Sequence, residues 1–170
     1  MSDLITINVT VNGEAISRGI APRETLADFL RQTLELTGTH TGCEMGVCGA
    51  CLVLLDGRVV HSCLMFAVQA DGSAVETIEG LSERSAIADI QEAFHERNAL
   101  QCGFCTPGVL MTAYSILSQP GVPSREEIRD ALSGNYCRCT GYEAIVDAIE
   151  NVARHRAAVT AGLQIEEASV

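Results

Sequence analysis

The sequence is poor in aromatic side chains and in positive charge. Aromatic residues make up 4% of the chain and Trp is absent, although 47% of the residues are hydrophobic. We therefore expect a folded chain with an aliphatic core. Eleven Lys and Arg stand against twenty-two Asp and Glu, which gives a net charge of −11. Such an acidic chain is poorly suited to phosphate backbones or anionic lipid surfaces, so we expect no nucleic-acid partner.

Long hydrophobic runs are also missing from the sequence. The longest, such as residues 51–55, are far too short to cross a bilayer, so no membrane span is expected. Residues 1–4 carry no basic segment, apolar stretch or twin arginine typical of an export signal, and we expect a cytoplasmic protein. In a reducing compartment the eight cysteines are poor candidates for structural disulfides, and their clustering indicates metal or redox chemistry instead.

The first half of the chain has strand patterns around one helix and one long loop. Apolar and polar residues alternate over 5–11, and Asn12-Gly13 predicts a tight turn into a second strand at 15–18. Thr25 is a suitable cap for a helix. Residues 37–50 contain four glycines and no apolar period, which indicates a functional loop. Further strands are expected at 51–55, 58–64 and 74–78. Together these elements predict a small α+β domain over residues 1–80.

The second half shows helical periods only. Thr106-Pro107 predicts a helix start, and Ser124 with Glu127 and Thr140 with Glu143 fit the capping-box pattern. We therefore expect a four-helix domain over residues 81–156, with its helices at 85–99, 106–117, 124–132 and from 140 onward. Residues 157–170 show no clear period and are expected to form a C-terminal tail that a partner could order.

Four cysteines of the first half have a recognisable ligand spacing. Cys43, Cys48 and Cys51 form C-x4-C-x2-C, and Cys63 follows after a turn, which is the plant-type pattern for a 2Fe-2S cluster. Three thiolates from one loop can bind two irons only if the backbone wraps around the cluster. The interspersed glycines permit the required conformations and close approaches. A structural zinc site is the main alternative, and a set of disulfides is a weaker one.

The other four cysteines lie in two short motifs of the helical half. Cys102 and Cys105 form C-x-x-C before the second expected helix, and Cys137 and Cys139 form C-x-C before the fourth. Free N–H groups and the helix dipole favour thiolates at such positions. This pattern alone also fits zinc. Together with the first motif it divides all eight cysteines into two sets of four.

Two histidines near the first motif raise the question of a Rieske-type site, in which two histidines replace two cysteines. His40 lies in the glycine-containing loop and His61 in an expected strand. Four cysteines already complete the ligand set. We therefore interpret His40 as a loop residue and His61 as a strand residue, both without a ligand role.

Three stretches of this sequence resemble one protein family. Residues 42–51 (GCEMGVCGAC), 101–108 (QCGFCTPG) and 135–142 (NYCRCTGY) closely resemble motifs of the iron-sulfur small subunits of molybdenum hydroxylases. This is the family of xanthine dehydrogenase, aldehyde oxidoreductase and carbon monoxide dehydrogenase. The motifs occur in the family's order, and the resemblance extends to about Arg156.

The resemblance implies a β-grasp ferredoxin-like domain followed by a four-helix domain, each with one 2Fe-2S cluster. It also implies an electron path from a molybdenum-pterin centre to the cluster of Cys102, Cys105, Cys137 and Cys139. The path would continue to the cluster of Cys43, Cys48, Cys51 and Cys63 and then to a flavin. By the same resemblance Gln101 and Cys139 would lie close to the pterin.

The implied partners are a large molybdenum-pterin subunit and a medium FAD subunit, assembled as a dimer of heterotrimers. The chain contains no Gly-x-Gly-x-x-Gly motif and no P-loop, which agrees with placing both of those cofactors on other chains. Two alternatives remain open. One is a free-standing ferredoxin-like carrier steered to its partners by its acidic charge. The other is an interaction module stabilised by zinc.

Overall fold

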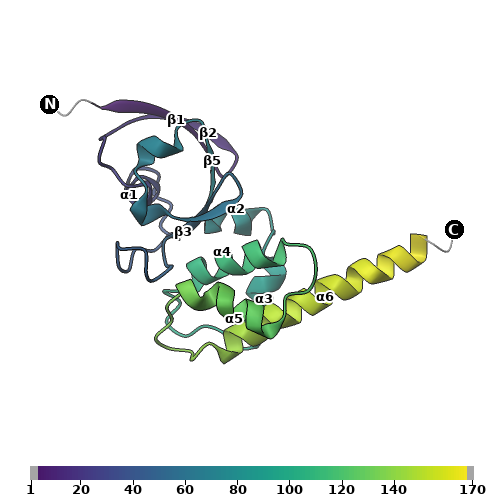
Figure 1. Cartoon of the computed structure of the whole chain (residues 1–170). Coiled ribbons are helices and arrows are strands. Elements are labelled where there is room, and N and C mark those ends of the chain that lie inside the picture. Colours follow the sequence, from purple (N-terminus) through teal and green to yellow (C-terminus); the bar gives the residue numbers. More distant parts are fainter. Residues whose placement is uncertain (1–3, 168–170) are drawn as a thin grey trace.

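The computed structural model of the chain describes residues 4–167, and the side chains of residues 4–162. Figure 1 shows a unit built around a sheet, coloured purple to teal, beside a unit of helices, coloured teal to yellow. The last helix leads away from the body toward the C-terminus. This arrangement confirms the expected α+β fold. Within residues 4–167 no helix is long and apolar enough to cross a membrane.

The sheet of the first unit has five strands in the order β2-β1-β5-β3-β4. β1 pairs antiparallel with β2 and parallel with β5, whereas β3 pairs antiparallel with both β5 and β4. Asn12 and Gly13 both have positive φ, which confirms the predicted tight turn between β1 and β2. The strands are β1 (Ile5–Val11), β2 (Glu14–Ile20), β3 (Leu52–Leu55), β4 (Arg58–His61) and β5 (Ala74–Glu76).

One helical segment covers the inner face of this sheet. It begins with α1 (Leu26–Asp28), whose predicted cap is confirmed because the hydroxyl of Thr25 accepts a hydrogen bond from the N–H of Asp28. It continues as a wider π-helical turn over Phe29–Thr33, where sequence periodicity predicts an ordinary helix. Leu26, Phe29 and Leu30 are fully buried and pack with strand residues such as Val53.

The second unit packs five helices around an aliphatic core, and the first of them is a short connecting helix that the sequence pattern does not predict. The predicted domain boundary at Gly80 lies inside it, and its Leu81 is buried in the helical core. β3 joins the two units, because Val53 faces the sheet core while Leu52 and Leu54 belong to the helical core. The helices are α2 (Ile78–Glu83), α3 (Ala88–Glu96), α4 (Thr106–Leu117), α5 (Arg125–Ala131) and α6 (Glu143–Glu167).

The predicted starts of α4 and α5 are confirmed, whereas the capping box predicted for α6 is wrong. Ser124 and Glu127 form the expected capping box of α5. Thr106 is the first residue of α4, and the capping position belongs to Cys105. The N–H of Glu143 donates to the carbonyl of Gly141 rather than to Thr140, so the second predicted box does not form.

Residues 157–167 of the expected C-terminal tail are helical, because α6 continues through them. Residues 158–162 of this extension are exposed on every side. An evenly exposed helix has no apolar stripe, which explains why the periodicity gives no signal here. Residues 168–170 lie outside the described residues.

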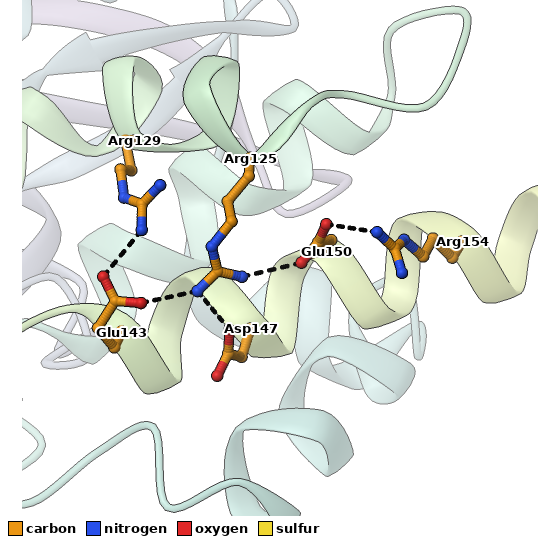
Figure 2. Close-up of polar contacts among 6 residues, drawn as sticks. All are labelled: Arg125, Arg129, Glu143, Asp147, Glu150 and Arg154. Atoms are coloured by element: carbon orange, nitrogen blue, oxygen red, sulfur yellow. Dashed lines mark hydrogen bonds and ion pairs between the residues drawn. The ribbon is translucent and has the colours of Figure 1, made fainter.

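A chain of ion pairs fixes α5 to the first turns of α6 (Figure 2). Arg125 lies at its centre and donates to three carboxylates of α6. Exposed pairs of this kind contribute little one by one, but here they join the two helices that flank the C-x-C motif. The full set pairs Arg125 with Glu143, Asp147 and Glu150, Arg129 with Glu143, and Arg154 with Glu150.

A second ion pair ties α6 to α3 and leads to a prediction about pH. The guanidinium of Arg156 donates to both carboxylate oxygens of Asp89, at 2.7 and 2.8 Å, and this lowers the pKa of Asp89 below its ordinary value. The stabilisation is therefore present near neutral pH and is lost as the pH falls through the pKa of folded Asp89, below about 4. We expect Asp89→Asn to lower the free energy of unfolding at pH 7 by about 0.2–1 kcal/mol, since the pair is partly exposed.

Urea unfolding at pH 7 and pH 3 checks this expectation, with Asp130→Asn on the exposed face of α5 as the control. The difference between Asp89→Asn and the unchanged chain should be smaller at pH 3 than at pH 7. A difference of the same size at both pH values would contradict the role assigned to the pair.

Candidate metal centres

The first set of cysteines is gathered by the loop before β3 and by the turn after β4. Cys43 and Cys48 lie in the loop, and Cys51 ends it directly before β3. Cys63 lies in a 3₁₀ turn, Ser62–Leu64, and not in the strand predicted for it. Leu52 pairs with His61 across β3 and β4, and this register brings the sulfurs of Cys51 and Cys63 to 3.2 Å.

Cys43 and Cys48 form a second pair of sulfurs in the same loop, with their side chains within hydrogen-bonding reach. Hydrogen bonds from the backbone N–H groups of Met45, Val47 and Cys48 lower the pKa of Cys43 to about 6. The N–H groups of Val47 and Cys48 each lie 3.4 Å from its sulfur. The wrapped backbone thus stabilises a thiolate at Cys43.

Burial has the opposite effect on the deeper sulfurs of this site. It raises the pKa of Cys63 to about 11, with further contributions from the neighbouring Cys51 and Cys43, and it also raises the pKa of Cys48. Thiolates crowded into a partly buried site require cations to offset their charge. The site therefore has the electrostatics of a metal centre.

Two of the glycines in this loop are confirmed in the role predicted for them. Gly46 and Gly49 have φ values of +74° and +70°, a region that other residues adopt only with strain. A Cβ on Gly42 would lie 3.2 Å from the sulfur of Cys48, so that glycine provides room beside the sulfurs.

The second set of cysteines also forms two pairs. Cys102 and Cys139 have sulfurs 3.6 Å apart and are exposed, while Cys105 and Cys137 interact more deeply in the helical unit. Burial, followed by the interaction with Cys137, raises the pKa of Cys105 to about 12. The expectation that a helix N-terminus favours the thiolate is therefore wrong for Cys105, where desolvation is the larger effect.

Cys137 behaves differently because Thr140 lies against its sulfur. Burial raises its pKa, but hydrogen bonds from the hydroxyl and N–H of Thr140, at 3.1 and 3.4 Å, outweigh this and lower it overall. Tyr142 supports the same loop, because its hydroxyl accepts from the N–H of Cys137 and donates to the carbonyl of Asn135. The sequence reasoning missed Tyr142 and treated Thr140 only as a helix cap.

The pairing of the sulfurs indicates which kind of metal centre fits. A two-iron cluster takes two thiolates at each iron, whereas structural zinc takes four ligands around one point. Both sites present two pairs of sulfurs. The donor set therefore fits a binuclear cluster in each unit. None of the eight cysteines is in a disulfide.

The two histidines considered for a Rieske-type site lie beside the cysteines without replacing any of them. Nδ1 of His61 lies 3.9 Å from the sulfur of Cys51. The ring of His40 stacks on Phe104 at 4.8 Å between centroids, and its Nδ1 lies 2.8 Å from the carbonyl oxygen of Phe104. His40 thus connects the first cysteine loop to the C-x-x-C motif of the other unit.

The two residues expected near a pterin lie together on the surface. The side-chain amide of Gln101 donates to the backbone carbonyl of Cys139 at 3.0 Å, and both residues are exposed. Exposed apolar side chains lie close in sequence to each set of cysteines. For the first set they are Met45, Val47, Leu64 and Phe66, and for the second they are Leu100, Phe104 and Tyr136.

Two family models match the chain. Residues 9–82 match the "2Fe-2S iron-sulfur cluster binding domain" and residues 77–150 match the "[2Fe-2S] binding domain". Among curated proteins, the chain is 53% identical over 149 residues to caffeine dehydrogenase subunit gamma of Pseudomonas sp. (strain CBB1), covering 86% of this chain and 89% of the relative. The chain belongs to the iron-sulfur subunits of the molybdenum hydroxylase family.

Other members of this family give the same result. The nicotine 6-hydroxylase small subunit of Paenarthrobacter nicotinovorans is 52% identical over 148 residues, which cover 87% of this chain and 89% of that protein. The solved quinoline 2-oxidoreductase from Pseudomonas putida 86 contains a chain with a TM-score of 0.87 and 51% identity, covering 94% and 98% of the two chains. Aldehyde oxidoreductase from Desulfovibrio gigas matches with a TM-score of 0.81 and 42% identity, over 88% of this chain and 17% of that longer chain. This chain is thus the iron-sulfur subunit of an oxidoreductase, and it contains two 2Fe-2S binding domains.

Proposed function

We propose that the eight cysteines hold two 2Fe-2S clusters and that the chain relays single electrons within a molybdenum hydroxylase. Cys43, Cys48, Cys51 and Cys63 would hold one cluster, and Cys102, Cys105, Cys137 and Cys139 the other. The observation that carries this proposal is the arrangement of the sulfurs as two pairs in each unit. When bound, such clusters supply reversible one-electron storage at potentials that the protein tunes.

The residues around the sulfurs have roles that follow from their contacts. Hydrogen bonds from Val47 and Cys48 to Cys43, and from Thr140 to Cys137, stabilise negative charge on the sulfurs. Donors of this kind raise the reduction potential of a cluster, while the burial that raises the pKa of Cys63 and Cys105 disfavours added charge. The chain itself would bind no substrate.

The direction of the relay is proposed from exposure together with the family resemblance. Gln101 and Cys139 are exposed at the second site, so a large molybdenum-pterin subunit would dock there, with Leu100 and Phe104 as apolar contacts. A medium FAD subunit would dock over the apolar side chains around the first site, such as Met45. Apolar groups left exposed around a redox site are typical of a protein interface. Electrons would then travel from the molybdenum-pterin centre through this chain to the flavin.

The relatives suggest a substrate class and a setting for the complex. The names of four relatives, which are 46–53% identical to this chain, refer to caffeine, nicotine, nicotinate and quinoline, all of which are nitrogen heterocycles. Aldehyde oxidoreductase, at 42% identity, is named for a different substrate. We therefore propose that the complex oxidises a nitrogen heterocycle on its large subunit, and that it assembles as a dimer of heterotrimers. Eight free thiols suit a reducing compartment, which supports a cytoplasmic location.

Purification of this chain from its native cells, through an affinity tag, tests the proposed assembly. We expect two larger chains to co-purify at equal stoichiometry, with molybdenum and FAD detected in the same fraction. An active hydroxylase isolated without this chain would contradict the proposal.

A free-standing electron carrier is the second candidate, and the net charge of −11 favours it because acidic surfaces steer small redox proteins to partners. Size-exclusion chromatography of untreated extract separates the two candidates. The subunit should elute in a large complex, whereas a free carrier elutes near its own mass of 18.1 kDa.

A further inference from the structure

Asn135 is a polar side chain buried where the two units meet, and neither the cysteine ligand sets nor the core explains it. Its exposed fraction is 1%, and it lies two residues before Cys137. The amide oxygen accepts a hydrogen bond from the hydroxyl of Thr112 on α4 at 2.8 Å. The amide nitrogen points toward the carbonyl of Gly49, in the loop of the first cysteine site, at 3.4 Å. Asn135 thus contacts the helical unit with one end of its amide and the sheet unit with the other.

The residue after Asn135 makes a direct link between the two cysteine sites. The N–H of Tyr136 donates to the carbonyl of Cys48 at 2.9 Å, so a single hydrogen bond joins a residue of the first ligand set to the neighbour of Cys137. The side chain of Tyr136 is 59% exposed. The position of the Tyr136 backbone N–H therefore depends on the buried Asn135 and not on the tyrosine ring.

Side-chain packing between the units is interrupted beside Asn135, although the backbones of Gly108 and Gly49 approach each other closely nearby. A cavity of about 320 Å³ opens beside Asn135, with Leu52 and His61 of the sheet unit on one wall and Thr112 and Ile116 of α4 on the other. Because apolar contact is interrupted at the cavity, the polar contacts of Asn135 hold the adjoining loops in register.

We propose that Asn135 is a positioning residue that fixes the separation and orientation of the two cysteine sites by seating the Tyr136 amide against the Cys48 carbonyl. The inference rests on the proposed function in one respect, since both sites must hold their clusters. The hydroxyl of Thr112 holds the side chain of Asn135 in this orientation. The hydroxyl of Tyr142 holds the backbone of Asn135, because it donates to the Asn135 carbonyl.

The test compares three variants of the full chain, with both clusters reduced, by electron paramagnetic resonance. Magnetic splitting between two reduced clusters depends steeply on their separation and relative orientation. Asn135→Leu removes both amide contacts, Thr112→Val removes only the hydroxyl donor, and Thr112→Ser retains it. We expect the splitting to change in Asn135→Leu and Thr112→Val, and to stay as in the unchanged chain in Thr112→Ser. Ser115→Ala, which alters another side chain lining the same cavity, is the matched control and should leave the splitting unchanged.

The iron and sulfide content of each protein is measured on the same samples. An unchanged chain that lacks two clusters would overturn the proposed function and this inference with it. Two full clusters with unaltered splitting in both Asn135→Leu and Thr112→Val would overturn the role of Asn135 alone.

A backbone substitution then isolates the proposed contact. Replacing Tyr136 by the corresponding α-hydroxy acid turns its N–H into an ester oxygen and changes no side chain. We expect the splitting to change as it does in Asn135→Leu, whereas Tyr136→Phe should leave it as in the unchanged chain. An ester variant with the original splitting would show that the Cys48 contact does not set the geometry.

Discussion

Replacing Cys51 by alanine should remove one cluster from the chain and leave the other. Cys51 is 1% exposed, and its sulfur lies 3.2 Å from that of Cys63 at the start of β3. Loss of this thiolate breaks one of the two sulfur pairs of the first site, and the three remaining thiolates then lack the cations that offset their charge. Because metal binding contributes directly to the folding of such a site, the loop over residues 37–50 should lose its order as well.

Iron analysis and electron paramagnetic resonance of the reduced variant check this expectation. Cys51→Ala should retain the signal of the helical unit only, and Cys105→Ala should retain the signal of the sheet unit only. Met45→Ala, at an exposed position of the same loop, is the control and should keep both signals. Two unchanged signals in Cys51→Ala would contradict the ligand assignment.

Replacing Gly108 by alanine should force the two units apart. A Cβ on Gly108 would lie 2.0 Å from the carbonyl oxygen of Gly49 and 3.2 Å from the Cα of Ala50, and both of these are backbone atoms. α4 cannot easily move away, since Val109 and Met111 are fully buried in the helical core. Overpacking against backbone costs about 1–3 kcal/mol or more of the free energy of unfolding.

Urea unfolding measures this loss of stability. Gly134→Ala is a matched control at the same contact between the two units, because a Cβ there meets no atom within 4 Å. We expect a large loss of stability in Gly108→Ala and a small one in Gly134→Ala. Equal stability of the two variants would show that close approach at Gly108 is not required.

The elements that could be predicted from the sequence are those fixed by local chemistry. Asn12-Gly13 specifies its turn through positive φ, and Ser124 and Glu127 specify their capping box within four residues. The cysteine spacings likewise identify two sets of four, because the ligands of each motif lie close together in the chain. The assignment of those cysteines to clusters remains a prediction.

The features that sequence reasoning missed depend on contacts between distant segments. Thr140 lies against the sulfur of Cys137 instead of capping α6, because the loop is held by the hydroxyl of Tyr142. Cys105 is partly buried against the helical core, and no local pattern indicates how far this raises the pKa of its thiol. The apolar periodicity of the sequence did not predict the short α2 or the exposed end of α6, because neither has an amphipathic stripe of useful length.

The central claim is that the eight sulfurs are shared between two binuclear iron sites. The most direct measurement combines iron, zinc and acid-labile sulfide analysis of the intact chain with electron paramagnetic resonance after reduction by dithionite. We expect two irons and two sulfides for each of the two cysteine sets, and two distinct rhombic signals. Zinc in either set, or iron and sulfide sufficient for only one cluster, would contradict it.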